Sequence, residues 1–143
     1  MTVIAFDGVT LAADKMISNG QTQSKTTKIF KHEDELLGLT GDISVGMEVL
    51  AWYLAGHVVK DYPVSNRKLD EGCTLIVIKP GPLVLKYESS PHAFVIEGAF
   101  QAFGCGDLAA LAAMEMGAKA PRAVEVACKL ASHCGMGIDT LTL

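Results

Sequence analysis

The stretch from Thr2 to Asp14 constrains the fold most, because it places a terminal segment inside a hairpin. Residues 2–6 form a short β-branched and apolar run, Asp7-Gly8 is a common two-residue hairpin turn, and residues 9–13 form a second apolar run. A chain end that is paired in a sheet is tied down, which is uncommon for a terminus. We therefore predict two short strands joined at Asp7-Gly8, with Asp14 at the end of the second strand.

Thr2 follows Met1 directly, so removal of Met1 would give Thr2 a free α-amine beside its hydroxyl group. The reference pKa of an α-amine is about 7.7–8.0, which makes it a usable base at neutral pH. An N-terminal amine is one of the known groups that activate a threonine hydroxyl as a nucleophile. Taken alone, the Met-Thr dipeptide is a weak signal and favours reading Thr2 as an ordinary strand residue.

Composition limits the function classes. The chain has 143 residues, half of them hydrophobic, and we expect residues 1–143 to form a single domain. The net charge is −4, whereas a nucleic-acid-binding domain is typically basic, so we expect no nucleic-acid partner. No apolar run is long enough to cross a bilayer, and no signal peptide precedes the hairpin, so we expect a cytoplasmic protein with no membrane partner.

The cysteines follow no metal-binding or disulfide pattern. None of the four stands in a CxxC spacing, and their surroundings are largely apolar. We therefore predict reduced thiols, without a zinc site or a disulfide framework. The four residues are Cys73, Cys105, Cys128 and Cys134.

Apolar periodicity predicts the remaining elements. After a polar loop over residues 15–27, short strands are expected at 28–31, 36–40, 73–78, 83–87, 94–97 and 135–143. Helices are expected at 43–60, 108–119 and 123–132, with a linker at 61–72 and a tight loop at 103–106. We expect Asp42 or Ser44 to cap the first helix, Asp107 to cap the second and Pro121 to lie at the start of the third. Strands and helices segregated in this way favour an α+β layered fold.

Several short motifs, kept in order, resemble proteasome β-type subunits and the bacterial proteasome-like peptidase HslV. They are the terminal Thr, Ala-Ala-Asp, Thr-Thr-Lys-Ile, Leu-Leu-Gly-Leu-Thr-Gly and Gly-Cys-Gly. The resemblance covers most of the chain. It implies an N-terminal nucleophile hydrolase fold, a four-layer αββα sandwich of two antiparallel sheets between two helix layers, here in a compact version. It also implies threonine peptidase chemistry on peptide or unfolded protein, a homo-oligomeric ring, and a feeding ATPase unfoldase as a possible partner.

The resemblance also assigns roles to single residues. Thr2 resembles the nucleophile, Lys28 the essential lysine, and Asp14 the buried acid that pairs with that lysine. Gly41 resembles the glycine whose backbone N–H holds the oxyanion, and we expect no metal or organic cofactor. Without the resemblance, Asp14 is equally well a strand-end residue, Lys28 is a solvated lysine, and Gly41 is an ordinary turn between strand and helix.

Three further residues have weaker support. Thr40 and Ile43 flank Gly41, so they are candidates to line a specificity pocket. Ser18 lies on the loop that faces substrate in the family.

The sequence also departs from the family. Cys105 stands where the family has serine in a Gly-Ser-Gly loop, and a thiol is a poorer hydrogen-bond partner than a hydroxyl group. The segment 132–134 reads Ser-His-Cys and offers no carboxylate where the family has an Asp. The N-terminal hairpin is shorter, the family's second helix is reduced to segment 61–72, and a final strand is absent.

Two hypotheses remain open at this point. The first is a threonine peptidase that works inside a ring once Met1 has been removed, and the set of Thr2, Asp14, Lys28 and Gly41 favours it. The second is a non-catalytic assembly protein with the same fold and Met1 retained, and both Cys105 and the missing acid near His133 favour it. The mass of the mature N-terminus would separate the two.

Overall fold

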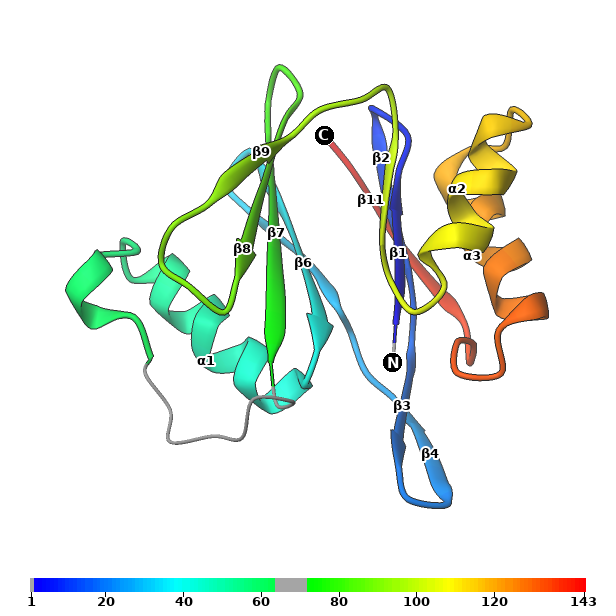
Figure 1. Cartoon of the computed structure of the whole chain (residues 1–143), viewed down its shortest axis with the longest axis horizontal. Helices are drawn as coiled ribbons and strands as arrows, with labels where there is room; N and C mark the ends of the chain where they lie inside the picture. The colour runs from blue at the N-terminus through cyan, green and yellow to red at the C-terminus, as the bar shows by residue number, and fades with distance from the viewer. Residues whose placement is uncertain (1, 64–71) are drawn as a thin grey trace.

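The computed structural model describes residues 2–63 and 72–143 of the chain. Its strands form a four-stranded sheet, a five-stranded sheet and a separate two-stranded hairpin, and all of these strand pairs are antiparallel. One helix covers the outer face of the five-stranded sheet and two helices cover the outer face of the four-stranded sheet (Figure 1). The predicted α+β fold, a four-layer αββα sandwich, is confirmed.

The four-stranded sheet carries the N-terminal hairpin at its centre. Its order is β10-β1-β2-β11, with β10 at Gln101–Gly104, β1 at Val3–Phe6, β2 at Thr10–Asp14 and β11 at Ile138–Thr142. Every residue of β1 is buried, because the sheet is covered on both faces. Val3 and Ala5 face the helices, whereas Ile4 and Phe6 face the other sheet.

The turn of this hairpin is shifted by one residue from the prediction. Phe6 pairs with Leu11, and Asp7 N donates to Thr10 O at 3.2 Å, so the two turn residues are Gly8 and Val9. The cause is the Asp7 side chain, whose Oδ1 accepts from Val9 N at 3.1 Å and from Thr10 N at 2.8 Å. These bonds keep Asp7 in the last paired position of the hairpin.

The five-stranded sheet forms the second inner layer. Its order is β5-β6-β7-β8-β9, with β5 at Ile29–His32, β6 at Glu35–Gly41, β7 at Cys73–Lys79, β8 at Leu83–Glu88 and β9 at Phe94–Ile96. The predicted strands are confirmed to within one or two residues. The two sheets meet through buried aliphatic and aromatic side chains, among them Ile4, Phe6, Leu11, Ile76 and Ile78. Each such side chain contributes about 1.5–3 kcal/mol when fully buried.

Helix α1 (Ile43–Leu54) is shorter than predicted. Asp42 caps it as expected, with its Oδ1 accepting from Val45 N at 3.0 Å. The helix does not continue to residue 60, because Gly56 has a φ of 106° and turns the chain away. A short 3₁₀ helix, η1 (Val59–Asp61), follows. Residues 64–71 of the predicted linker 61–72, where the family's second helix was expected, lie outside the described residues.

Three strands were not predicted. Residues 15–27 were expected to be a loop, but they contain the hairpin of β3 (Met16–Asn19) and β4 (Thr22–Lys25). All of β4 is exposed, so no apolar alternation indicated a strand. The segment 103–106 was expected to be a tight loop, yet its first two residues complete β10, which pairs with β1 along its whole length.

Helices α2 (Asp107–Glu115) and α3 (Ala120–Leu130) form the other outer layer. Their small buried residues pack closely on the sheet; these are Ala110, Ala120, Ala123 and Ala127. The predicted cap of α2 is wrong, since Gly106 takes the N-cap position and Asp107 lies in the first turn. Pro121 lies in the first turn of α3, as predicted. Among the described residues, no helix has the length and hydrophobicity needed to cross a membrane.

The hairpin turn also caps α3. Asp7 Oδ2 accepts from Ala120 N at 2.9 Å, and Lys119 at the N-cap position makes no side-chain bond of its own. We expect Asp7→Ala to lower the free energy of unfolding by about 1–2 kcal/mol, since it removes an N-terminal acceptor for the helix. Urea denaturation at neutral pH measures the change. Asp34→Ala, in the exposed turn between β5 and β6, is the control and is expected to change little.

This stabilisation depends on pH. Burial acts to raise the pKa of Asp7, but the bonds from Ala120, Thr10 and Val9 outweigh it and lower the pKa below 3.8. A carboxylate with a lowered folded-state pKa stabilises fully above its unfolded pKa, which is about 3.9, and loses that contribution as the pH falls through the folded-state value. The difference between the wild type and Asp7→Ala should therefore shrink in acid. A difference that grows in acid would contradict this assignment.

Candidate active site

Asp14, at the end of β2, is the centre of the candidate site. It is fully buried, and its carboxylate accepts bonds from several sides. Oδ1 accepts from Lys28 Nζ at 2.8 Å and from Val3 N at 3.0 Å. Oδ2 accepts from Gly135 N at 3.1 Å and from Met16 N at 3.2 Å. Asp14 therefore ties the first strand, the start of β3, the lysine and the segment before β11 to one point.

Lys28 precedes β5 and is the buried cation of the site. Its side chain is 1% exposed, and its ammonium group forms an ion pair with Asp14. Leu39 N of the neighbouring strand donates to Lys28 O at 2.9 Å, which extends the β5–β6 pairing to this residue. A buried charge needs a partner at short range, and Asp14 supplies it.

Thr2 is held by the loop that follows β10. It is 4% exposed, and its backbone N lies 3.3 Å from Cys105 Sγ. Gly104 has a φ of 95°, and a Cβ on it would lie 2.1 Å from Thr2 O. A Cβ on Gly106 would lie 2.8 Å from the Cβ of Val3. The two glycines of the Gly-Cys-Gly motif therefore let the loop approach the N-terminal strand closely.

Gly41 ends β6 at the mouth of the site. Its φ is 88°, and an added Cβ would lie 2.4 Å from Gly72 O, so no other residue fits without a shift of the backbone. Asp42 N donates toward β7, to Gly72 O at 3.1 Å, whereas Leu39 N donates toward β5. Because N–H groups along a strand alternate in direction, the Gly41 N–H is directed away from β7, on the side of Lys28.

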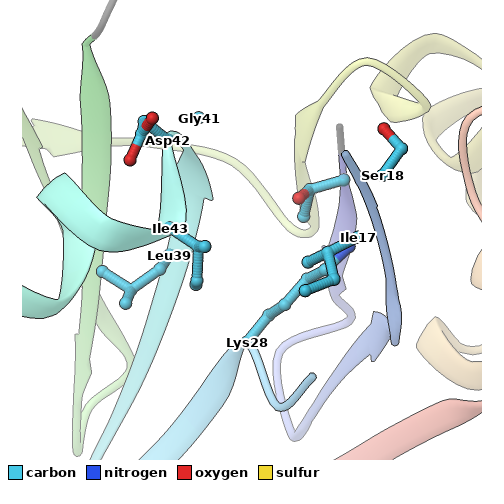
Figure 2. Close-up of a pocket in the computed structure, with 8 residues that line it drawn as sticks. Ile17, Ser18, Lys28, Leu39, Gly41, Asp42 and Ile43 are labelled. Carbon is cyan, nitrogen blue, oxygen red and sulfur yellow. The ribbon is translucent and has the colours of Figure 1, made fainter. Parts of the chain in front are cut away.

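These residues surround a pocket of about 230 Å³. Figure 2 shows Ile17, Ser18 and Lys28 on one wall and Leu39, Asp42 and Ile43 on the other. Thr2 and Gly41 complete the lining. The pocket is therefore lined by apolar side chains, by the buried Lys28 ammonium group and by the Thr2 hydroxyl group.

The structure brings most of the predicted site residues together. Thr2, Lys28, Gly41, Ser18 and Ile43 all line the pocket. Asp14 and Cys105 do not line the pocket, but each contacts a residue that does: Asp14 Oδ1 accepts from Lys28 Nζ, and Cys105 Sγ accepts from Thr2 N. Thr40, which was a candidate pocket residue, is buried in β6 and does not line the pocket.

Sequence reasoning missed several residues of the site. Ile17, Leu39 and Asp42 line the pocket. Neither β3 nor β6 alternates between buried and exposed residues, so no pattern in the sequence pointed to the first two. Gly135 donates only its backbone N–H to Asp14, and because nearly every residue type has this group, the sequence could not point to Gly135. In the described part of the chain, no group of three or more His, Cys, Asp or Glu side chains is arranged to hold a metal ion.

Comparison with known proteins supports the architecture through structure rather than sequence. No protein-family profile matches the sequence, and no curated protein sequence matches it either. BPH from Thiobacillus denitrificans superposes with a TM-score of 0.69 at 17% identity, over 100% of this chain and 97% of that chain. HslV from Trypanosoma brucei gives a TM-score of 0.69 at 18% identity, over 99% and 98% of the two chains. The chain has the proteasome-type N-terminal nucleophile hydrolase fold.

A further structure with the proteasome-type fold is Anbu, an ancestral β-subunit, from Yersinia bercovieri. It gives a TM-score of 0.72 at 8% identity, over 100% of this chain and 82% of that chain. Identities this low establish the fold alone. The fold agrees with the resemblance that the sequence motifs indicate, and the chemistry rests on the residues of this chain.

Proposed function

We propose that residues 1–143 form a single proteasome-like domain that acts as an N-terminal threonine peptidase once Met1 has been removed. The substrate class is peptide or unfolded protein, cleaved inside a homo-oligomer. One observation carries the proposal: Asp14 binds both Lys28 Nζ and Val3 N, so the buried ammonium is fixed next to the strand that presents Thr2 to the pocket.

Each residue has a defined part in the reaction. The Thr2 amine, directly or through a water molecule, accepts the hydroxyl proton while Thr2 Oγ1 attacks the peptide carbonyl. The Gly41 N–H donates to the resulting oxyanion. The amine then passes the proton to the leaving nitrogen, an ester of Thr2 remains, and water hydrolyses it.

Lys28 and Asp14 act on this chemistry electrostatically. An ammonium group next to the Thr2 hydroxyl stabilises the alkoxide and disfavours protonation of the neighbouring amine. Asp14 Oδ1 accepts from Lys28 Nζ at 2.8 Å and fixes the position of the ammonium group, so Asp14 is a positioning residue. Cys105 Sγ, 3.3 Å from the Thr2 nitrogen, replaces the hydroxyl partner that the family has there.

A non-catalytic assembly protein is the second candidate. Cys105 in place of serine and the absence of a carboxylate at residues 132–134 favour it. Hydrolysis of a fluorogenic peptide by the form that lacks Met1, but not by its Thr2→Ala variant, supports the peptidase. Inertness of both forms supports the assembly protein.

The assembly part of the proposal rests on exposed apolar side chains on α2, at its C-cap and on α3. Leu108 is 78% exposed, Met116 is 88% exposed and Leu130 is 74% exposed. Exposed apolar residues mark subunit contacts when they form a contiguous patch, and we propose that these residues do. A structural neighbour with a TM-score of 0.71 at 13% identity was solved as the helical assembly of the Anbu complex from Pseudomonas aeruginosa. An ATPase unfoldase is the proposed partner by resemblance, and the site is proposed to work in the cytoplasm.

We expect light scattering at micromolar concentration to give a mass several times that of the 15.1 kDa chain. The reason is that burying these side chains between subunits removes apolar surface from water. A matched variant, Leu108→Glu with Leu130→Glu, should lower the mass without changing the circular dichroism spectrum. A wild-type protein that stays monomeric would contradict the compartmentalised peptidase, while the fold would stand.

A further inference from the structure

Two cysteines from distant parts of the chain meet behind Thr2. Cys105 Sγ and Cys134 Sγ lie 3.7 Å apart, although the residues are separated by 29 positions. Cys105 follows β10, and Cys134 lies in the segment between α3 and β11. A disulfide bond has an S–S length of about 2.05 Å, so the two sulfur atoms are less than 2 Å from bonding distance.

Both cysteines lie next to the atoms of the candidate site. Cys105 Sγ contacts the Thr2 nitrogen at 3.3 Å and Thr2 O at 3.4 Å. Gly135, which directly follows Cys134, donates its N–H to Asp14 Oδ2 at 3.1 Å. The thiol pair therefore joins the loop that holds the nucleophile to the segment that holds the acid.

The two thiols differ in accessibility. Cys105 is exposed and can meet a small oxidant, whereas Cys134 is 6% exposed and is shielded from solvent. Burial raises the pKa of Cys134 to about 12, and the neighbouring Cys105 adds to the increase through its bond and charge. Cys105 is thus the thiol that reacts first with an oxidant, and Cys134 is the one placed to attack the oxidised sulfur.

We propose that Cys105 and Cys134 are a reversible oxidation site for hydroperoxides, and that their disulfide lowers the activity at Thr2. The effect on activity rests on the proposed function, whereas the disulfide itself does not.

The chemistry balances in two steps. The Cys105 thiolate attacks one oxygen of a hydroperoxide, the O–O bond breaks, and Cys105 becomes a sulfenic acid while hydroxide (from hydrogen peroxide) or alkoxide leaves. The Cys134 sulfur then attacks the Cys105 sulfur, forms the S–S bond and releases the sulfenic oxygen as water, taking up the proton that Cys134 loses. Overall two thiols are oxidised, and hydrogen peroxide is reduced to two waters.

The disulfide would change the surroundings of Thr2 in two ways. Cys105 Sγ, which accepts from the Thr2 N–H, would be drawn toward Cys134, and it would have no S–H group left to donate to Thr2 O. The segment of Gly135 would be drawn with Cys134, which disturbs its bond to Asp14. We expect a loss of activity of about tenfold, the size expected from one hydrogen bond of ordinary strength to the amine.

The first experiment measures the disulfide directly. The full chain is treated with hydrogen peroxide, its free thiols are then alkylated, and the intact mass and peptide map are determined. We expect two of the four thiols to be lost, one cross-linked peptide pair containing Cys105 and Cys134, and full recovery with dithiothreitol. Oxidation of Cys105 to sulfinic acid without cross-linking, or a pairing with Cys128, would overturn the proposal.

The second experiment measures the consequence in the form that lacks Met1. Cys134→Ala should keep the basal peptidase activity and lose the reversible inhibition by peroxide, whereas Cys128→Ala, half-buried on α3, should keep the inhibition. A disulfide that forms without any loss of activity would overturn the second half of the proposal. If the wild type hydrolyses nothing in either redox state, the proposed function and the effect on activity both fail, and the mass measurement still decides the disulfide.

Discussion

Replacing Lys28 with alanine is expected to abolish peptidase activity in the form with an exposed Thr2. The Lys28 ammonium group lines the pocket with Thr2, and Asp14 holds it at 2.8 Å. Its side chain is 1% exposed, so solvent screens the charge of the ammonium group only weakly. Losing one preorganised electrostatic partner of this kind lowers kcat on the order of 10²–10³-fold. The measurement is kcat/KM on a fluorogenic peptide.

Folding must be controlled in this experiment. Without Lys28 the Asp14 carboxylate stays buried without its cation, and breaking such a pair costs about 3–5 kcal/mol of stability. The backbone N–H groups of Val3, Met16 and Gly135 still donate to the Asp14 carboxylate in the variant. Lys28→Met fills more of the lost volume, and circular dichroism with light scattering checks folding and assembly for both variants.

Lys25→Ala is the matched control, because Lys25 is exposed on β4 and lies outside the pocket lining. We expect it to keep full activity. If activity survives in Lys28→Ala but is lost in Lys25→Ala, the catalytic lysine is Lys25 and the assignment to Lys28 is wrong.

The fold could be predicted wherever burial left a pattern in the sequence. Strands β1 and β7 are covered on both faces, so they appear as continuous apolar runs. Hairpin β3–β4 could not be recognised, because all of β4 is exposed and its residues therefore show no alternation of buried and exposed side chains. The end of α1 was misplaced because the apolar spacing continues beyond Gly56, where the backbone turns.

The candidate site could be predicted only in part, for a related reason. Asp14 and Lys28 are 14 positions apart, and no spacing rule brings them together; the family resemblance pointed to the pair, and the structure places them at 2.8 Å. The bond from Gly135 could not be predicted, because any residue has a backbone N–H. The Cys105–Cys134 contact depends on how the β10–α2 loop meets the segment before β11, which is decided by tertiary packing.

The second large effect concerns Met1. While Met1 is attached, the Thr2 nitrogen is an amide without a basic lone pair, so Thr2 has no base of its own. Loss of general base catalysis lowers a rate by about 10²–10⁴-fold. We therefore expect preparations that retain Met1 to be inactive. A form made by cleaving a fusion protein directly before Thr2 should hydrolyse small peptides, as measured with a fluorogenic substrate after the N-terminus has been verified by intact mass.

A peptide epoxyketone tests the same point without turnover. Its two electrophilic carbons can be attacked by the hydroxyl group and the amine of one N-terminal threonine, so stable addition reports both groups at once. We expect the mass of the probe on Thr2 in the cleaved form alone, and none in the Met1 form or in Thr2→Ala. A cleaved form that folds and assembles but stays unlabelled and inert would favour the assembly protein, because Thr2, Lys28 and Gly41 would then line a pocket that does no chemistry.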